Sequence, residues 1–258
     1  MHNYLIAAGL IALALAIGAG AYARMGTDWR TASRASVGLA PDPTATPEAV
    51  VQVYAARTVG VRGLFGVHSW IAVKPPRGTA YTVYEVVGWK LRSAATAVVS
   101  SERPPDARWY GNDPELLADL RGSAAESLIP RITRAVWSYP YEGEYRAWPG
   151  PNSNTFTAWV TRAVPELEVD LPPTAIGKDY LRGTVFATAP SGAGYQISFA
   201  GLLGITVSSV EGLEINVLGL SFGVDPWPLA INLPVAGRIG TPLVDSRARG
   251  SSTTFMRK

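Results

Sequence analysis

The chain has 258 residues, of which 47% are hydrophobic, and it carries 23 Lys and Arg against 20 Asp and Glu. This composition indicates a folded protein with a sizeable core, and a net charge of +3 from scattered basic residues argues against nucleic acid as a partner. The absence of Cys excludes disulfides, thiolate metal sites and a thiol nucleophile. Because there are only two His, we expect neither a bound metal nor a cofactor.

Residues 4–23, YLIAAGLIALALAIGAGAYA, form an uncharged apolar run that is long enough, as a helix, to cross a membrane. We expect a membrane anchor over residues 1–24, because the run is longer than a signal-peptide core and no Lys or Arg precedes it. The sequence Ala21-Tyr22-Ala23 keeps a cleaved signal peptide as the alternative. We therefore expect a single-pass protein of the bacterial inner membrane. Its soluble domain is expected in the periplasm, although the Arg residues after the run favour the cytoplasm.

Residues 25–49 include VGLAPDPTATPEA, in which three prolines alternate with small residues. This composition is typical of a stiff linker, so the folded part is expected to begin near Val50 with a strand in VVQVYAARTVGV. GVHSWIAVK and YTVYEVVGWKL predict a β-hairpin, because two β-branched and aromatic runs flank the turn sequence Pro75-Pro76-Arg77-Gly78.

The register of this hairpin decides whether its one histidine meets a carboxylate. If the turn closes symmetrically on Pro76 and Arg77, His68 lies directly opposite Glu85, and Trp70 lies opposite Val83. Directly opposed side chains are close enough for a hydrogen bond between imidazole and carboxylate. A slip of one residue would send His68 and Glu85 to different faces of the sheet.

Three helices are expected after the hairpin. DPELLADLRG has Asp113 as a candidate N-cap and Pro114 at the first helical position. SAAESLIPRITRAVWSYP continues with helical apolar spacing, and Pro130 should kink or divide this segment. SNTFTAWVTRAV predicts a third helix that ends by Pro165.

The segment 182–240 is poor in charge and rich in Gly, and its apolar residues alternate in YQISF, GITVSSV and LEINVLGLSF. Alternation of this kind predicts strands. We expect them to form a second small β-core rather than a sheet that faces lipid. Residues 241–258 are expected to be a flexible basic tail.

The stretch GPNSNTFTAWV places small polar residues directly before an apolar helical run. Ser153 could be a nucleophile at this helix N-terminus, because the helix dipole and free backbone N–H groups would stabilise an oxyanion there. The alternative is plain capping, since Asn152, Ser153, Asn154 and Thr155 are all favourable N-cap residues. From the residues alone, capping is the favoured interpretation.

NSNTF followed by an amphipathic helix resembles the N-C-N-x-F nucleophile motif of the permuted papain-like hydrolases, such as the desumoylating isopeptidases and the lecithin:retinol acyltransferase-like proteins. In those families a His on an early strand precedes the nucleophile, as His68 precedes Ser153 here. The resemblance implies His68 as general base, Glu85 as the residue that orients it, and Ser153 at the nucleophile position. The departure is the Ser in place of Cys, because a hydroxyl needs a well-aligned base where a thiol can ionise.

A second resemblance covers the chain from about Trp29 to Gly240. The blocks GVHSWIAVKP, YEVVGW, SYPY, WPGPNSNTF and LPPTAIGKDY are similar to those of an uncharacterised bacterial family with an N-terminal hydrophobic segment. This resemblance implies a family and no activity.

These expectations combine into an α+β fold with a permuted papain-like core of hairpin and helix, an added C-terminal β-region and an N-terminal transmembrane helix. The core is expected at 50–181 and its β-rich extension at 182–240.

Three functions remain open. The first is a membrane-anchored envelope protein whose degenerate papain-like groove serves as a binding or scaffold module for a peptide, glycan or lipid-like ligand. The second is a serine-dependent amidase or acyltransferase that uses His68 and Ser153, and the third is a purely structural envelope protein. The candidate groove and supporting residues are Asn152, Asn154, Trp70, Tyr84 and Trp148.

Overall fold

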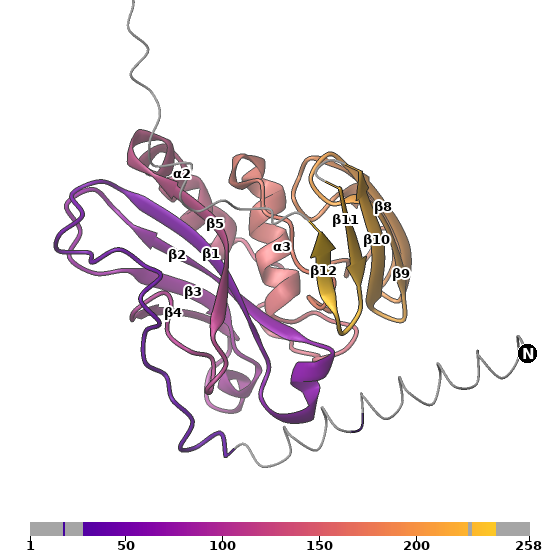
Figure 1. Cartoon of the computed structure of the whole chain (residues 1–258), viewed down its shortest axis with the longest axis horizontal. Coiled ribbons are helices and arrows are strands. Elements are labelled where there is room, and N and C mark those ends of the chain that lie inside the picture. The colour runs from indigo at the N-terminus through magenta and orange to yellow at the C-terminus, as the bar shows by residue number, and fades with distance from the viewer. Residues whose placement is uncertain (1–17, 19–27, 227–228, 241–258) are drawn as a thin grey trace, which may run out of the picture.

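The computed structural model of the chain describes residue 18, residues 28–226 and residues 229–240 (Figure 1). Two antiparallel sheets are arranged on either side of a helical layer. Helix α3 lies between the sheets, and helix α2 lies beside it against the first sheet (Figure 1). The described helices are α2 (Gly122–Trp137) and α3 (Ser153–Ala163), and three short 3-10 helices lie at Gly60–Leu64, Gly88–Arg92 and Pro165–Leu167.

The first sheet has five strands in the order β4-β3-β2-β1-β5. Their bounds are β1 (Val50–Arg57), β2 (Val67–Lys74), β3 (Thr82–Val86), β4 (Val98–Glu102) and β5 (Pro114–Arg121). Strand β2 is buried on both faces. Helices α2 and α3 cover one face, and residues 36–41 and 103–109 cover the other, where Asp106 Oδ2 accepts hydrogen bonds from Ser36 Oγ and from the Leu39 and Ala40 amides.

Strand β5 is the segment for which the sequence predicted a helix, and that prediction is wrong. Its residues pair antiparallel with β1, from Val50 opposite Arg121 to Ala56 opposite Pro114. The local signals at Asp113 and Pro114 favoured a helix start. They were outweighed because the ladder to β1 buries Leu117 and Ala118 against the helices.

The two helices begin where the sequence placed them. In α2 the buried residues recur at helical spacing, as Ala125, Leu128, Ile132, Ala135 and Val136. Pro130 lies inside α2 and does not divide it. Helix α3 ends at Ala163, before Pro165, as predicted.

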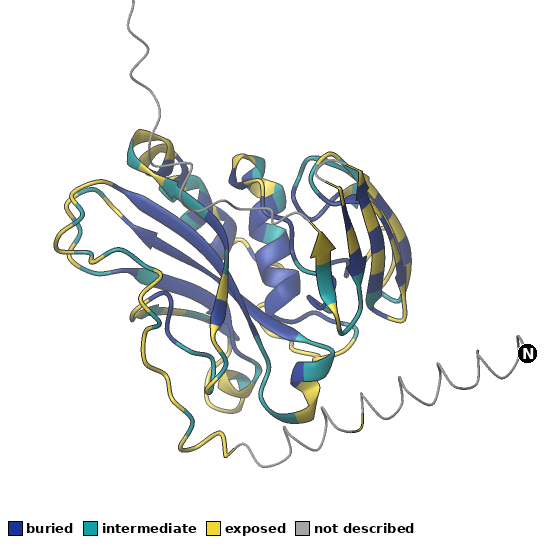
Figure 2. Cartoon of the chain, in the orientation of Figure 1, coloured by how far each residue is buried: buried dark blue, intermediate teal, exposed yellow. Residues whose placement is uncertain are grey.

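The second sheet is a seven-stranded meander in the order β12-β11-β10-β9-β8-β7-β6. Its strands are β6 (Phe186–Thr188), β7 (Gly194–Phe199), β8 (Leu203–Ser208), β9 (Gly212–Val217), β10 (Leu220–Pro226), β11 (Leu229–Leu233) and β12 (Gly237–Gly240). Residues alternate between buried and exposed along these strands (Figure 2). The strands in YQISF, GITVSSV and LEINVLGLSF are therefore confirmed.

The expected papain-like α+β fold is wrong. Within the described residues the chain is mostly β, with twelve strands in two antiparallel sheets and two α-helices. The prediction failed because β5 replaces an expected helix and the C-terminal segment builds a sheet larger than the first.

The expected transmembrane helix and inner-membrane location also need correction. Within the described part of the chain, no helix is long and apolar enough to cross a membrane, so the expected spanning helix is not found there. The apolar run 4–23 itself lies outside the described residues, apart from Gly18.

Candidate functional site

The β2–β3 hairpin brings His68 and Glu85 into contact through a register that differs from the predicted one. Ala72 pairs with Val83, where the symmetric turn would have placed Trp70, so the register is shifted by two residues. An even shift keeps every side chain on its face of the sheet. His68 and Glu85 are consequently diagonal neighbours rather than a direct pair, and His68 Nε2 lies 2.7 Å from Glu85 Oε2.

This pair is sealed under aromatic residues. His68 is 4% exposed, and its ring stacks on Trp109 with 3.6 Å between centroids. The second oxygen of Glu85 accepts a hydrogen bond from Arg103 Nη2 at 3.4 Å. Burial raises the pKa of Glu85, but the hydrogen bond and charge of His68, together with Arg103, outweigh burial and bring this pKa below its ordinary value. The pair thus ties the loop at 103–109 to the sheet.

Ser153 lies on the opposite face of this sheet from His68. The residue after His68 on β2, Ser69, points at α3, where its Oγ donates to Asn154 Oδ1 at 2.9 Å and to the Ser153 carbonyl at 3.4 Å. Neighbouring side chains on a strand point to opposite faces. The structure therefore brings His68 and Glu85 together and keeps Ser153 apart from both.

The polar cluster at the start of α3 caps the helix. Asn152 Oδ1 accepts from the backbone N–H groups of Asn154 and Thr155 at 2.9 and 3.2 Å, and Thr155 Oγ1 accepts from the Asn152 N–H. This arrangement is a capping box, so the capping interpretation is confirmed. Ser153 is the first helical residue and is only 3% exposed.

The remaining candidate groove residues do not line a common groove. Asn154 holds α3 to the first sheet, with Nδ2 donating to the Val67 carbonyl at 3.0 Å. Trp70 lies on the His68 face and Tyr84 on the helical face. Trp148 is exposed and donates through Nε1 to the Leu218 carbonyl at the second sheet.

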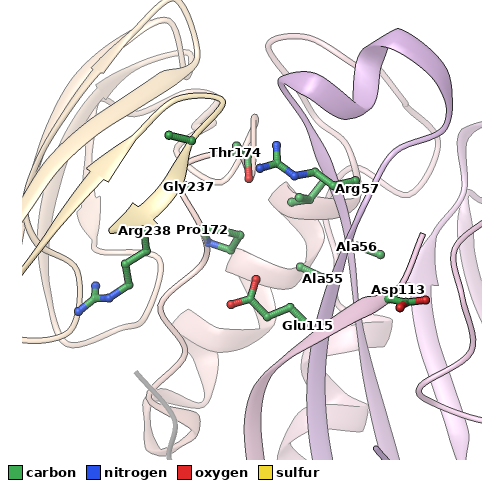
Figure 3. Close-up of a pocket in the computed structure, with 11 residues that line it drawn as sticks. Ala55, Ala56, Arg57, Asp113, Glu115, Pro172, Thr174, Gly237 and Arg238 are labelled. Atoms are coloured by element: carbon green, nitrogen blue, oxygen red, sulfur yellow. The ribbon is translucent and has the colours of Figure 1, made fainter. Parts of the chain in front are cut away.

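A pocket of about 230 Å³ lies where β1 and β5 approach β12 (Figure 3). Burial raises the pKa of Glu115 in its wall, and the Arg57 guanidinium opposes this. Both cations of the pocket have protein partners: Arg57 donates to the Val235 carbonyl at 3.0 Å, and Arg238 donates to Asp170 and Asp225. The pocket is smaller than the usual 300 to 1,000 Å³ of ligand sites, and the hydrogen bond from Arg57 on β1 to Val235, just before β12, joins the two sheets beside it.

The inner face of the second sheet is polar and holds buried charges. Lys178 Nζ contacts Glu214 on β9 and lies 3.3 Å from Asp179, whose other oxygen accepts from Asn216 Nδ2 at 2.8 Å. Glu211 accepts from the Ser191 amide and hydroxyl at 2.7 Å each. These bonds anchor the sheet to the loop at 170–191 through ionic and polar contacts rather than an apolar core.

The outer face of the same sheet is apolar and exposed. Two long rows of side chains run across it through paired positions, beside a shorter row of Phe199, Leu203 and Val217. One row contains Phe186, Ile197, Ile205, Ile215 and Phe222, and the other contains Tyr195, Val207, Leu213, Val224, Ile231 and Ile239. Figure 2 shows the exposed positions of this face alternating with buried positions along the strands. We name these eleven residues the apolar face.

The sequence predicted strands β7 to β10 but the wrong orientation for them, because it placed their apolar residues in a small core. The alternation shows that two faces differ and does not show which face meets solvent. The sequence did contain one indication of the orientation. Glu214 and Asp225 occupy the same alternate positions as the polar residues of their strands, so one face carries both the polar residues and the charges.

Comparison with known families gives one match. A model for a protein family of unknown function, DUF3750, matches residues 48–180, which are 133 of the 258 residues. The chain belongs to the DUF3750 family. The expectation of an uncharacterised family is thus confirmed, while its bacterial origin and its N-terminal hydrophobic segment stay predictions. The match spans the first sheet and both helices of this DUF3750 protein and ends before the second sheet. No curated protein and no solved structure matches the chain.

Proposed function

We propose that this DUF3750 protein is a scaffold module that associates with a protein partner through the apolar face of its second sheet. The observation that carries the proposal is that this sheet turns its apolar side chains outward. A serine-dependent reaction is not proposed, because Ser153 and His68 lie on opposite faces of the first sheet.

The size of the apolar face supports an association. Seven strands span six spacings of about 4.8 Å, and with about five residues of about 3.4 Å per strand on average they cover roughly 500 Å² in projection. The largest apolar patch on a typical monomer is about 300 to 600 Å² of accessible surface and is often functional. Because half-exposed side chains stand above the plane of the sheet, the accessible apolar area exceeds its projection.

Charge favours a protein over a lipid surface as the partner. Four charged residues lie between 186 and 240, and all four point inward: Glu211, Glu214 and Asp225 are at most 2% exposed, and the Arg238 side chain is 13% exposed. Surface elements that bind bilayers usually combine apolar residues with a basic rim. The described part of this sheet exposes no cation, whereas the cores of protein interfaces are depleted in charge.

The absence of native Cys allows a direct test by thiol labelling. Ile215 lies on the central strand β9 and is 46% exposed, and Leu39, on the far side of the first sheet, is 44% exposed. In cells that produce the full chain, we expect the thiol of Ile215→Cys to react with a permeant maleimide at least about tenfold more slowly than that of Leu39→Cys. The two positions are matched in exposure, so a difference in rate reports a partner.

The protection should persist in a mild non-ionic detergent, which exchanges with lipid without separating a packed protein interface. Equal labelling rates in cells would show that the apolar face is uncovered and would refute the proposal. Protection that disappears in detergent would assign the face to lipid and would refute it as well.

A further inference from the structure

We propose that the partner on the apolar face is a second copy of this chain, so that two seven-stranded sheets pack face to face about a two-fold axis. This inference rests on the proposed function and names its partner. It follows from the pattern of the face, the area available and the direction of the buried charges.

The second sheet lacks the apolar layer that a sheet normally packs against. A sheet buries its apolar face on a helix or on another sheet. Here the helical layer meets the polar face instead, because Lys178 and Asp179 bind Glu214 and Asn216 there. The apolar side is therefore left without a partner within the described residues, and a sheet of the same kind would complete a sandwich.

The composition of the apolar face suits packing against itself. Ile, Val and Leu predominate and Phe and Tyr lie among them, while Tyr195 contributes the sole hydroxyl of the eleven residues. Two inner faces of a sandwich interdigitate such side chains across about 10 Å and need no side-chain hydrogen bonds. A two-fold interface is made from one self-complementary patch, and an uncharged patch meets its copy without repulsion.

The area is sufficient for a stable dimer. Two faces of roughly 500 Å² in projection bury more than about 1,000 Å² of accessible surface in total, which is the level that separates specific interfaces from accidental contacts. Interfaces of permanent homodimers are also the most apolar class, resembling a domain core cut in half.

The symmetry makes a specific prediction about which residues meet. Strand β9 is the fourth of seven in the sheet. In a face-to-face dimer the two-fold axis lies in the plane of the interface and passes through its centre. Whatever its direction in that plane, it places the central strand of one sheet over the central strand of the other. Ile215 on β9 therefore faces the neighbourhood of Ile215 in the second copy.

Crosslinking the full chain in cells tests this prediction. Because the covered thiol reacts slowly, the reaction is given at least about tenfold longer than labelling of Leu39→Cys needs; a bismaleimide that spans about 10 Å, the spacing of packed sheets, is then expected to convert most of the Ile215→Cys variant into a species of twice the 27.4 kDa chain mass. Leu39→Cys should give little of this species, which controls for dimers formed elsewhere in the chain.

A charge in the face should break the association without unfolding the chain. Ile205, adjacent to Ile215 on β8, is 52% exposed, so Lys is tolerated there in the single chain. Adding Ile205→Lys to Ile215→Cys is expected to reduce the crosslinked species at least about tenfold, and Leu39→Lys should not. Circular dichroism of each variant checks that the fold is kept.

The outcomes separate the inference from the proposed function. Slow labelling of Ile215→Cys that persists in detergent, without a crosslinked dimer, would mean a different protein partner and would overturn the inference alone. Labelling as fast as that of Leu39→Cys would overturn both. A crosslinked dimer that Ile205→Lys leaves unchanged would also refute the face-to-face arrangement.

Discussion

Replacing Glu214 by Gln should remove a pH-dependent loss of stability near neutrality. Glu214 points inward from β9, is 2% exposed, and contacts Lys178 Nζ. Burial raises the pKa of Glu214 to about 7, with the Lys178 ammonium opposing this and the charge of Asp179 adding to it. Its second oxygen, Oε1, has no hydrogen-bond partner among the described residues, so nothing further favours the ionised form.

The sign and size follow from proton binding. Between the ordinary pKa of 4.5 and about 7, folded Glu214 holds a proton that the unfolded chain has released. This contribution to the free energy of unfolding is complete below pH 4.5 and is lost as the pH rises through about 7. At about 1.36 kcal/mol per pH unit, the loss is about 3 kcal/mol, and the Gln amide cannot undergo it.

Urea unfolding followed by Trp fluorescence measures this effect in the full chain and in Glu214→Gln. We expect the difference in unfolding free energy, wild type minus variant, to fall by about 3 kcal/mol between about pH 4.5 and 8. Glu166→Gln is the control, because its carboxylate is exposed beside Arg131 and its pKa is lowered. A difference for Glu214→Gln that is constant or rises with pH would refute the reasoning.

Four further substitutions test the contacts around α3 and the hairpin. Asn152→Ala should lower the free energy of unfolding by about 2 kcal/mol through loss of the helix cap, while Ser153→Ala should change it by less than about 0.5 kcal/mol. Thermal melts compare the two variants, and equal losses of stability would contradict the capping role of Asn152. Glu85→Gln should reduce the loss of unfolding free energy on acidification. The lowered pKa of Glu85 contributes stability that is present above its unfolded pKa and is lost as the pH falls. Urea midpoints at about pH 5 and 3 measure this loss, and an equal loss in the wild type and the variant would contradict the prediction. Gly177→Ala should destabilise by at least about 1 kcal/mol, because Gly177 has φ +94° and an added Cβ would lie 2.5 Å from Asn152 Nδ2; a melting temperature equal to that of the wild type would count against this packing.

The hairpin and the capped helix could be predicted because their signals are local. The run of polar residues before Phe156 contains the N-cap and its reciprocal bond within four residues, so no distant contact is needed to fix it. The hairpin strands were recognised by β-branched composition, but their pairing register is shifted by two residues from the symmetric one. The contact of His68 with Glu85 survived this error only because the shift was even.

The relation between His68 and Ser153 could not be predicted, because it depends on which face of the sheet the helix covers. The alternation along β2 separates His68 from Ser69 whatever the fold. Only the packing of α3 shows that Ser69 faces the helix and that His68 faces Trp109. A short motif and the chain order of two residues carry no information about that choice.

The sequence by itself determined four strands of the second sheet, β7 to β10, together with their alternation and the low charge of the segment, since each is a property of neighbouring residues. Tertiary structure alone decided that β5 is a strand, because the edge of β1 supplied its partner. It also decided the orientation of the second sheet, because Lys178 and Asp179 bind its polar face from inside, through Glu214 and Asn216, which lie 36 and 37 residues further along the chain. Alternation by itself does not show which face of a sheet is buried, and only contacts between residues distant in the sequence decide it.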